Sequence, residues 1–259
     1  MNVVCSKCNH SHHFDVEVVD YTGFSCEACF SYFTVSPGSD GSLIQEFVHI
    51  NTQRPSNILP KLNELVSFEG INYRIISVIV RKSKSNDLST EYVGLSTKDE
   101  YIYFSHGNGY YCVLDYLDET DFTKTTNHSI LYEDEEYIFD ESDISDTIYA
   151  EGFVYEDIRN SVKAITYENR DDEDFFISEE LIDNKVEFYD GKYLGMSDFN
   201  RIFSKSSHTD LTTSTYSDSL HFSNLGNSIS SAFNPNRISQ FIKIGAGAFG
   251  ICFIVFFIG

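Results

Sequence analysis

Apolar and polar residues alternate in short runs between about residues 57 and 205. A two-residue period is typical of strands with one buried face, and the runs are rich in Tyr, Phe, Val and Ile, which favour strands. The pattern predicts strands at Leu65–Phe68, Tyr73–Arg81, Glu91–Leu95, Tyr101–Ser105, Tyr110–Tyr116, Tyr137–Phe139, Thr147–Tyr155, Val162–Tyr167 and Val186–Tyr189.

Dipeptides that favour tight turns separate several of these runs. Glu69-Gly70, Asn108-Gly109 and Asp190-Gly191 supply glycine where a hairpin turn needs a left-handed backbone. Ser197 to Phe203 carries apolar residues at helical spacing and predicts a short closing helix. We therefore expect a mainly β fold, with an acidic antiparallel β barrel or sandwich over residues 57–205.

Residues 1–35 contain two Cys-x-x-Cys pairs, Cys5 with Cys8 and Cys26 with Cys29. This spacing predicts a small zinc ribbon in which four thiolates bind one metal ion. A closed four-sulfur shell leaves no position for water, so the zinc is expected to be structural. Rubredoxin-like iron and two redox dithiols are the alternatives.

Between the cysteine pairs, Phe14, Val16 and Val18 alternate with acidic residues and predict one hairpin that bridges the two metal knuckles. Glycine usually follows the second cysteine of a knuckle. Asn9 tolerates the left-handed backbone needed there and Phe30 does not readily, so we expect an irregular second knuckle. A unit this short must draw its stability from metal binding, about 10 kcal/mol, and should unfold without zinc.

Two segments are rich in residues typical of connections. Residues 36–56 begin with a Pro- and Gly-containing stretch and predict a linker, with one short apolar piece at Phe47–Ile50 that could be a strand. Residues 206–239 are rich in Ser, Thr and Asn and predict a flexible tether.

Residues 240–259 are strongly apolar apart from Lys243, and with Lys243 reaching the interface the stretch Ile238–Gly259 is just long enough to span a bilayer. We expect a single transmembrane helix; a buried core helix, or a cut within a longer membrane region, are the alternatives. Arg237 and Lys243 precede the apolar run, which places the bulk of the chain in the cytoplasm. The absence of an apolar leader before Cys5 also argues against secretion and for reduced thiols.

The chain has 40 Asp and Glu against 18 Lys and Arg, a net charge of -22, and most of the excess lies between residues 57 and 205. A field of this sign repels phosphate backbones, so we expect no nucleic-acid partner. Cationic ligands fit better. The acidic runs Glu133–Glu136, Asp140–Asp143 and Asp171–Asp174 lack the spacing of a calcium loop and predict solvated loops.

Three histidines follow the first cysteine pair. His10, His12 and His13 could form a second metal site or replace a cysteine ligand. Because four cysteines already complete the shell, we expect them to be exposed hairpin residues. Cys112 and Cys252 lie in apolar runs and are expected to be small buried side chains.

Short aromatic motifs recur in the β region, at Glu91-Tyr92, Tyr103-Phe104-Ser105, Gly109-Tyr110, Ala150-Glu151-Gly152, Tyr167 and Glu187–Tyr193. Together they resemble the bacterial domain of unknown function numbered four-one-seven-eight, over residues 60–200. The resemblance implies an all-β domain without assigned activity, an N-terminal zinc ribbon and a following membrane segment. It also implies gene neighbours that serve polyamine synthesis and membrane stress. Family members usually carry Trp in the strand motifs, and this chain has none.

The chain has no nucleophile elbow, no phosphate-binding loop and no His-Glu-x-x-His motif. A binding function is therefore favoured over an enzyme, with catalysis left open. The leading hypothesis is a membrane-anchored cytoplasmic adaptor that binds a protein partner. The alternative is an enzyme or binding protein that acts on cationic small molecules such as polyamines.

Overall fold

The computed structural model describes residues 2–14, 16–18, 21–37, 43–50, 60–126, 128–182 and 185–204. The described elements are β1 (Asn2–Val4), β2 (Ser11–His13), β3 (Gly23–Cys26), β4 (Ser31–Pro37), β5 (Leu43–Ile50), β6 (Leu65–Phe68), β7 (Ile71–Ser83), β8 (Leu88–Ser96), β9 (Tyr101–Gly107), β10 (Tyr110–Leu117), β11 (Phe122–Thr126), β12 (Ser129–Tyr132), β13 (Glu135–Val154), β14 (Val162–Asn169), β15 (Phe175–Ile182), β16 (Lys185–Tyr193) and the helix α1 (Met196–Ser204).

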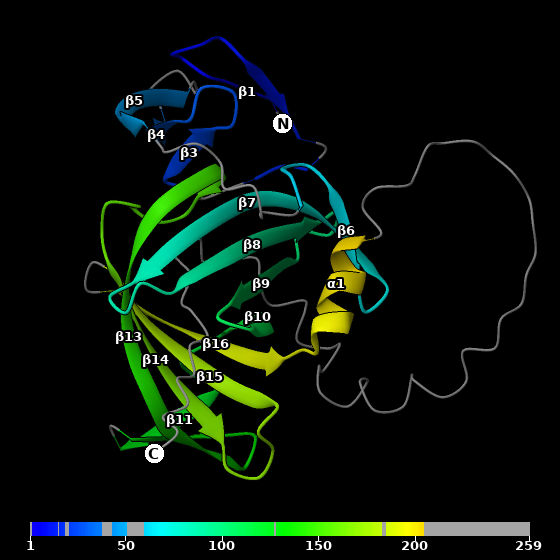
Figure 1. Ribbon diagram of the computed structural model, residues 1–259, viewed down its shortest axis with the longest axis vertical. Helices are drawn as coiled ribbons and strands as arrows, with labels where there is room; N and C mark the ends of the chain where they lie inside the picture. Colours follow the sequence, from blue (N-terminus) through cyan, green and yellow to red (C-terminus); the bar gives the residue numbers. More distant parts are fainter. Residues whose placement is uncertain are drawn as a thin grey trace, which may run out of the picture.

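An eight-stranded antiparallel barrel forms the centre of the structure and confirms the mainly β prediction (Figure 1). Its strands follow the order β7-β8-β9-β10-β16-β15-β14-β13. Pairing of β13 with β7 closes the ring, so neither strand is left with an open edge there. The N-terminal strands β3, β4 and β5 lie at one end of the barrel, and α1 lies along its side next to β6 (Figure 1).

The long strand β13 connects every part of the sheet. It pairs with β12 and β14 along its first half, with β7 along its second half, and with β3 at its end. The sequence pattern divided it into Tyr137–Phe139 and Thr147–Tyr155, with Asp140–Asp143 as a solvated loop, and this prediction was wrong. Pairing with β14 continues through the acidic run, opposite Glu141 and Asp143. Backbone hydrogen bonding therefore defines this strand where side-chain hydrophobicity does not.

The cysteine-containing segment folds as two hairpins, not as the single one predicted. β1 pairs with β2 around the first cysteine pair, and β3 pairs with β4 around the second. Phe14, Val16 and Val18 are buried, as their alternation indicated, but they form no described strand. β3 also pairs with β13, and β5, which lies within the segment 36–56, pairs with β4. β3, β4 and β5 therefore continue the barrel sheet.

Two of the three predicted glycine turns are confirmed. Asn108-Gly109 joins β9 to β10 and Glu69-Gly70 joins β6 to β7, with positive φ at all these residues. Asp190-Gly191 is instead part of β16 and pairs with both β15 and β10. A Cβ on Gly191 would lie 2.2 Å from the ring of Phe176, so glycine here makes room for that ring.

The predicted helix is confirmed as α1, which packs its apolar side on the outer face of the barrel. Phe199, Ile202 and Phe203 are buried. The ring of Phe203 lies 5.0 Å from that of Tyr92 on β8 and 5.4 Å from that of Phe104 on β9. The strands β11, β12 and β15 match none of the predicted runs.

No helix among the described residues is long and apolar enough to cross a membrane. The predicted tether at 206–239 and the predicted membrane segment at 240–259, with Cys252, lie outside the described residues.

Gly152, where β13 leaves β7 for β3, should be intolerant of alanine. Its φ is +82°, and a Cβ would lie 2.2 Å from the carbonyl oxygen of Ile76. Gly70 has the same φ with nothing within 4 Å, so it is a matched control for backbone strain alone. We expect Gly70→Ala to lower the free energy of unfolding by about 1–2 kcal/mol, and Gly152→Ala by about 1–3 kcal/mol more. Urea denaturation measures both, and equal losses would contradict the close approach at Gly152.

Candidate metal centre

The four cysteines lie at the turns of the two N-terminal hairpins. Cys5 and Cys8 occupy the β1–β2 turn, while Cys26 ends β3 and Cys29 lies in the turn before β4. In each turn the fifth residue donates its backbone N–H to the first cysteine carbonyl, at 2.9 Å from Asn9 to Cys5 and 2.8 Å from Phe30 to Cys26.

The second knuckle is regular, contrary to the sequence-based expectation. Phe30 has a φ of 55°, close to the 59° of Asn9. The bulky residue therefore adopts the left-handed backbone that was expected only of Asn9. Its ring is half-buried and packs against an apolar cluster that includes α1, and this packing offsets the strain.

The four sulfurs converge as the spacing predicted. Sγ of Cys5 lies 3.7 Å from Sγ of Cys29, and Sγ of Cys8 lies 3.7 Å from Sγ of Cys26. All four sulfurs lie within 4.8 Å of one another. Zinc–sulfur bonds of about 2.3 Å in a tetrahedron place the sulfurs about 3.8 Å apart, so the four cysteines could hold one metal ion.

The thiols differ in acidity because they differ in burial and hydrogen bonding. Burial raises the pKa of Cys5 and of Cys26. For Cys29, burial also acts to raise the pKa, but hydrogen bonds from Ser31 and from the other three cysteines lower it to about 7. Metal binding must therefore displace protons from buried thiols, which couples affinity to pH.

His12 is not an exposed hairpin residue, and that expectation was wrong for this one of the three histidines. Its side chain is buried, and its Nε2 lies 3.2 Å from Sγ of Cys26. Burial, followed by the charge of His10, lowers the pKa of His12 to about 4. His10 and His13 are exposed, as predicted.

The centre is attached to the barrel by aromatic packing. The ring of His12 lies 4.9 Å from that of Phe24 on β3, and Phe24 lies 5.3 Å from Phe153 on β13. Phe14 contacts Phe153 at 4.7 Å. Cys5 and Cys26 belong to the same apolar cluster as Ile79 and Val93 of the barrel, so both regions share one core.

A buried arginine occupies the inside of the barrel. Arg81 on β7 is fully buried, and its Nε lies 3.1 Å from both carboxylate oxygens of Glu91 on β8. Its two terminal nitrogens donate to Glu156 and, at 2.9 Å, to Thr147 on β13. The guanidinium therefore binds the strands on both sides of β7 and the loop that follows β13.

Glu180 on β15 adds a third buried carboxyl group to this site. It is 1% exposed, and its Oε2 has no hydrogen-bond partner among the described residues. Burial raises its pKa well above the ordinary value, and the negative charge of Glu91 raises it further. Arg81 already forms ion pairs with Glu91 and Glu156. Within the described part of the chain Glu180 has no such partner of its own and is therefore expected to carry a proton.

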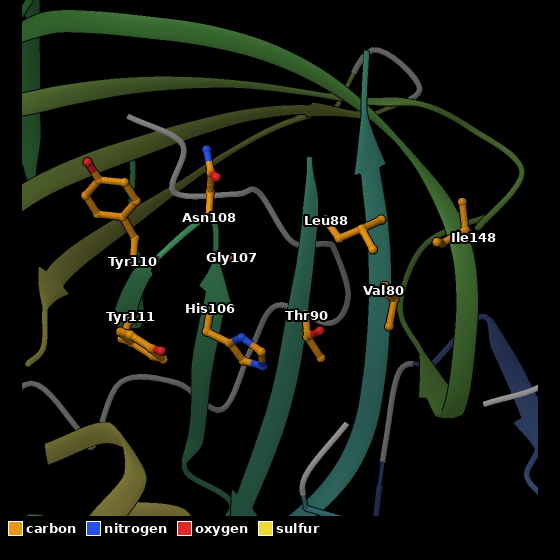
Figure 2. A pocket seen from close by; sticks show the side chains of 10 residues that line it. Val80, Leu88, Thr90, His106, Gly107, Asn108, Tyr110, Tyr111 and Ile148 are labelled. Atoms are coloured by element: carbon orange, nitrogen blue, oxygen red, sulfur yellow. The ribbon is translucent and has the colours of Figure 1, made fainter. Parts of the chain in front are cut away.

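A groove of about 210 Å³ crosses the outer face of the barrel, next to the β9–β10 turn. Figure 2 shows side chains from neighbouring strands in one row along it, among them Ile148, Val80, Thr90 and His106. The Nε2 of His106 lies 3.1 Å from the hydroxyl of Tyr92, and burial lowers the pKa of His106. The groove thus combines apolar and aromatic walls with one neutral imidazole.

The cysteines could be identified from the sequence, whereas the four buried charged residues in the barrel, Arg81, Glu91, Glu156 and Glu180, were not. Arg81 lies two residues from the core residue Ile79, and Glu91 lies two residues from the core residue Val93, so the alternation calls for an inward side chain at both positions. A charged residue in such a position indicates an internal ion pair. Cys112 is fully buried, as predicted.

No family model, curated protein or solved structure matches this chain. The fold and the site therefore define its class: a mainly β protein whose eight-stranded antiparallel barrel carries an N-terminal four-cysteine centre able to hold a metal ion.

Cys29→Ser should abolish stoichiometric metal binding and loosen the N-terminal strands. The matched control is Cys112→Ser, which changes a buried cysteine outside the centre. We expect about one metal equivalent that survives mild chelation in the wild type and in the control, and well under one in Cys29→Ser, by elemental analysis. Hydrogen exchange should show lost protection in β1–β4 and retained protection in β8 and β9. Full protection of β1–β4 after metal removal would contradict a structural role.

Glu180→Gln should stabilise the protein increasingly as pH rises. A carboxyl with a raised folded-state pKa takes up a proton on folding, so its contribution to stability falls as pH increases above the unfolded value. Glutamine mimics the protonated form and does not titrate. The difference in unfolding free energy should grow above about pH 4.5, by at most about 1.4 kcal/mol per pH unit. Exposed Glu173→Gln is the control, and a difference independent of pH would show that Glu180 is ionised in the fold.

Proposed function

We propose that this chain is a zinc-containing adaptor, anchored to a membrane by residues 240–259 with its barrel in the cytoplasm, and that it binds a protein partner. The convergence of four sulfurs into one closed set carries the proposal. A metal ion held in that set has no coordination position left for a substrate, so it serves the fold. The ion stabilises two hairpins that would otherwise lack a sufficient core of their own.

Zinc is the metal proposed for the centre. A tetrahedral site of four thiolates suits zinc, which has no redox chemistry and no geometric preference that the protein must satisfy. Iron binds the same ligand set. Elemental analysis of protein produced with both metals present distinguishes the two.

The outer groove is the surface that we assign to the partner. Leu88 at its rim is 50% exposed, and Ile148 is 37% exposed. His106 and Tyr111 stack in the groove at 6.1 Å between ring centroids. Aromatic side chains in a partly apolar depression are typical of protein-binding sites, where they contribute area at low entropic cost. The resemblance to a domain without assigned activity, linked to membrane stress, agrees with an adaptor.

A second candidate is a protein that acts on cationic small molecules such as polyamines. One observation favours it: Glu91, Glu156 and Glu180 surround a single arginine inside the barrel. The guanidinium of Arg81 forms ion pairs with two of these carboxyl groups, Glu91 and Glu156, as a cationic ligand would. Calorimetric binding of spermidine that disappears in Glu180→Gln would favour this candidate over the adaptor.

Site-specific photo-crosslinking tests the adaptor. A photoreactive phenylalanine analogue replaces Leu88 at the groove, and in the control it replaces Leu131 on β12, which is similarly exposed at 41%. Full-length protein in its native membranes should give one discrete crosslinked partner from position 88 and none from position 131. The crosslink should weaken in His106→Ala, because that change removes a groove wall.

Truncation of the chain tests whether residues 240–259 anchor the protein to the membrane. Full-length protein should sediment with membranes, and a chain ending at residue 239 should not. Absence of any crosslink from position 88, together with turnover of a substrate by the purified protein, would overturn the adaptor proposal.

A further inference from the structure

Beside the four-cysteine centre lies a second group of metal-binding side chains. His10, His12 and Glu27 each offer one ligand atom, and these atoms lie within 4.8 Å of one another. Nδ1 of His12 lies 3.8 Å from a carboxylate oxygen of Glu27. The rings of His10 and His12 meet edge to face at 4.6 Å.

The orientation of His12 gives this group its chemistry. Nε2 of His12 lies 3.2 Å from Sγ of Cys26, so this nitrogen is turned toward the four-cysteine centre. The other ring nitrogen, Nδ1, is turned toward the carboxylate of Glu27, 3.8 Å away. That distance is too long for a direct hydrogen bond and short enough for both atoms to bind one ion.

We infer that His10, His12 and Glu27 form a second metal site that binds an exchangeable divalent transition ion such as zinc. Imidazole nitrogens and a carboxylate are the ligands of zinc centres that keep an open position. This second site is separate from the structural ion proposed for the four cysteines. The two sites are linked through the contact of His12 with Cys26.

The side chains can close around an ion without moving the backbone hairpins. Tetrahedral zinc with bonds of about 2.0–2.1 Å places nitrogen and oxygen ligands about 3.3–3.4 Å apart. His10 is exposed and the side chain of Glu27 is 40% exposed, so both can rotate inward toward the fixed ring of His12. The same exposure leaves a fourth position for water or an exogenous ligand.

This coordination predicts a weaker and faster-exchanging ion than the one bound by four thiolates. Zinc titration of the metal-free full chain, followed by mild chelation, should show one retained and one removable equivalent. Cobalt substitution separates the two spectroscopically, because only the four-cysteine centre gives intense thiolate-to-cobalt charge transfer. The second cobalt should add only weak ligand-field absorption.

Single substitutions test whether the second, removable metal equivalent binds to His10, His12 and Glu27. His10→Ala and Glu27→Gln should each weaken it at least about tenfold while the charge-transfer band stays unchanged. His13→Ala, which removes an exposed imidazole of the same hairpin outside the group, should leave both equivalents intact. A wild type that binds one equivalent, or a second equivalent that persists in both variants, would overturn the site. Loss of the charge-transfer band in the wild type would instead count against the four-cysteine centre.

Discussion

Burial of Arg81 at the seam of the barrel is the constraint on which the structure depends. β7 and β13 close the ring here, and the fully buried guanidinium reaches Glu91 on one side and Thr147 on the other. A buried charge is tolerable only when its partners are present, and removing one partner of such a pair typically costs about 3–5 kcal/mol. The closed barrel in this register therefore requires β8, β13 and the loop bearing Glu156 all to be in place around Arg81.

The same strand that closes the barrel also supports the metal centre. β13 passes from β7 to β3 at Gly152, which pairs with Ser77 on one side and Ser25 on the other. Ser25 precedes Cys26, so a shift of β13 relative to β7 would move one of the four clustered cysteines. β3 and β4 are thus part of the barrel sheet. Cys5 and Cys8, in contrast, lie at the turn of the separate two-stranded sheet of β1 and β2, so the four-cysteine centre joins two sheets.

Residues with strong local preferences were the ones that the sequence could place. Convergence of Cys5, Cys8, Cys26 and Cys29 followed from spacing, and Asn108-Gly109 formed its turn, because in each case the chemistry is local. The failures depend on distant partners. Phe30 adopts a left-handed backbone, and its ring packs against an apolar cluster that includes residues of α1, far away in the sequence.

The sequence pattern failed to predict two features for the same reason. These are the acidic half of β13 and the inward position of Arg81 on β7. Asp140–Asp143 forms a strand because β14 supplies the hydrogen bonds, although the side chains alone predict a loop. Arg81 lies inward because Glu91 and Glu156 lie there too, and no two of these three residues are neighbours in sequence. Both features depend on contacts between strands, and the alternation of residues along a single strand does not reveal those contacts.

The distribution of charge restricts what kind of partner the proposed binding groove would select. The chain carries a net charge of -22, yet the groove wall formed by Val80, Thr90 and His106 is neutral at physiological pH. Specific contacts in the groove must then come from shape and aromatic packing. The surrounding negative field acts at longer range, where it speeds the approach of basic partners and opposes acidic ones. A partner with an apolar centre and a basic rim would satisfy both conditions, whereas a small cation alone would gain little from the groove.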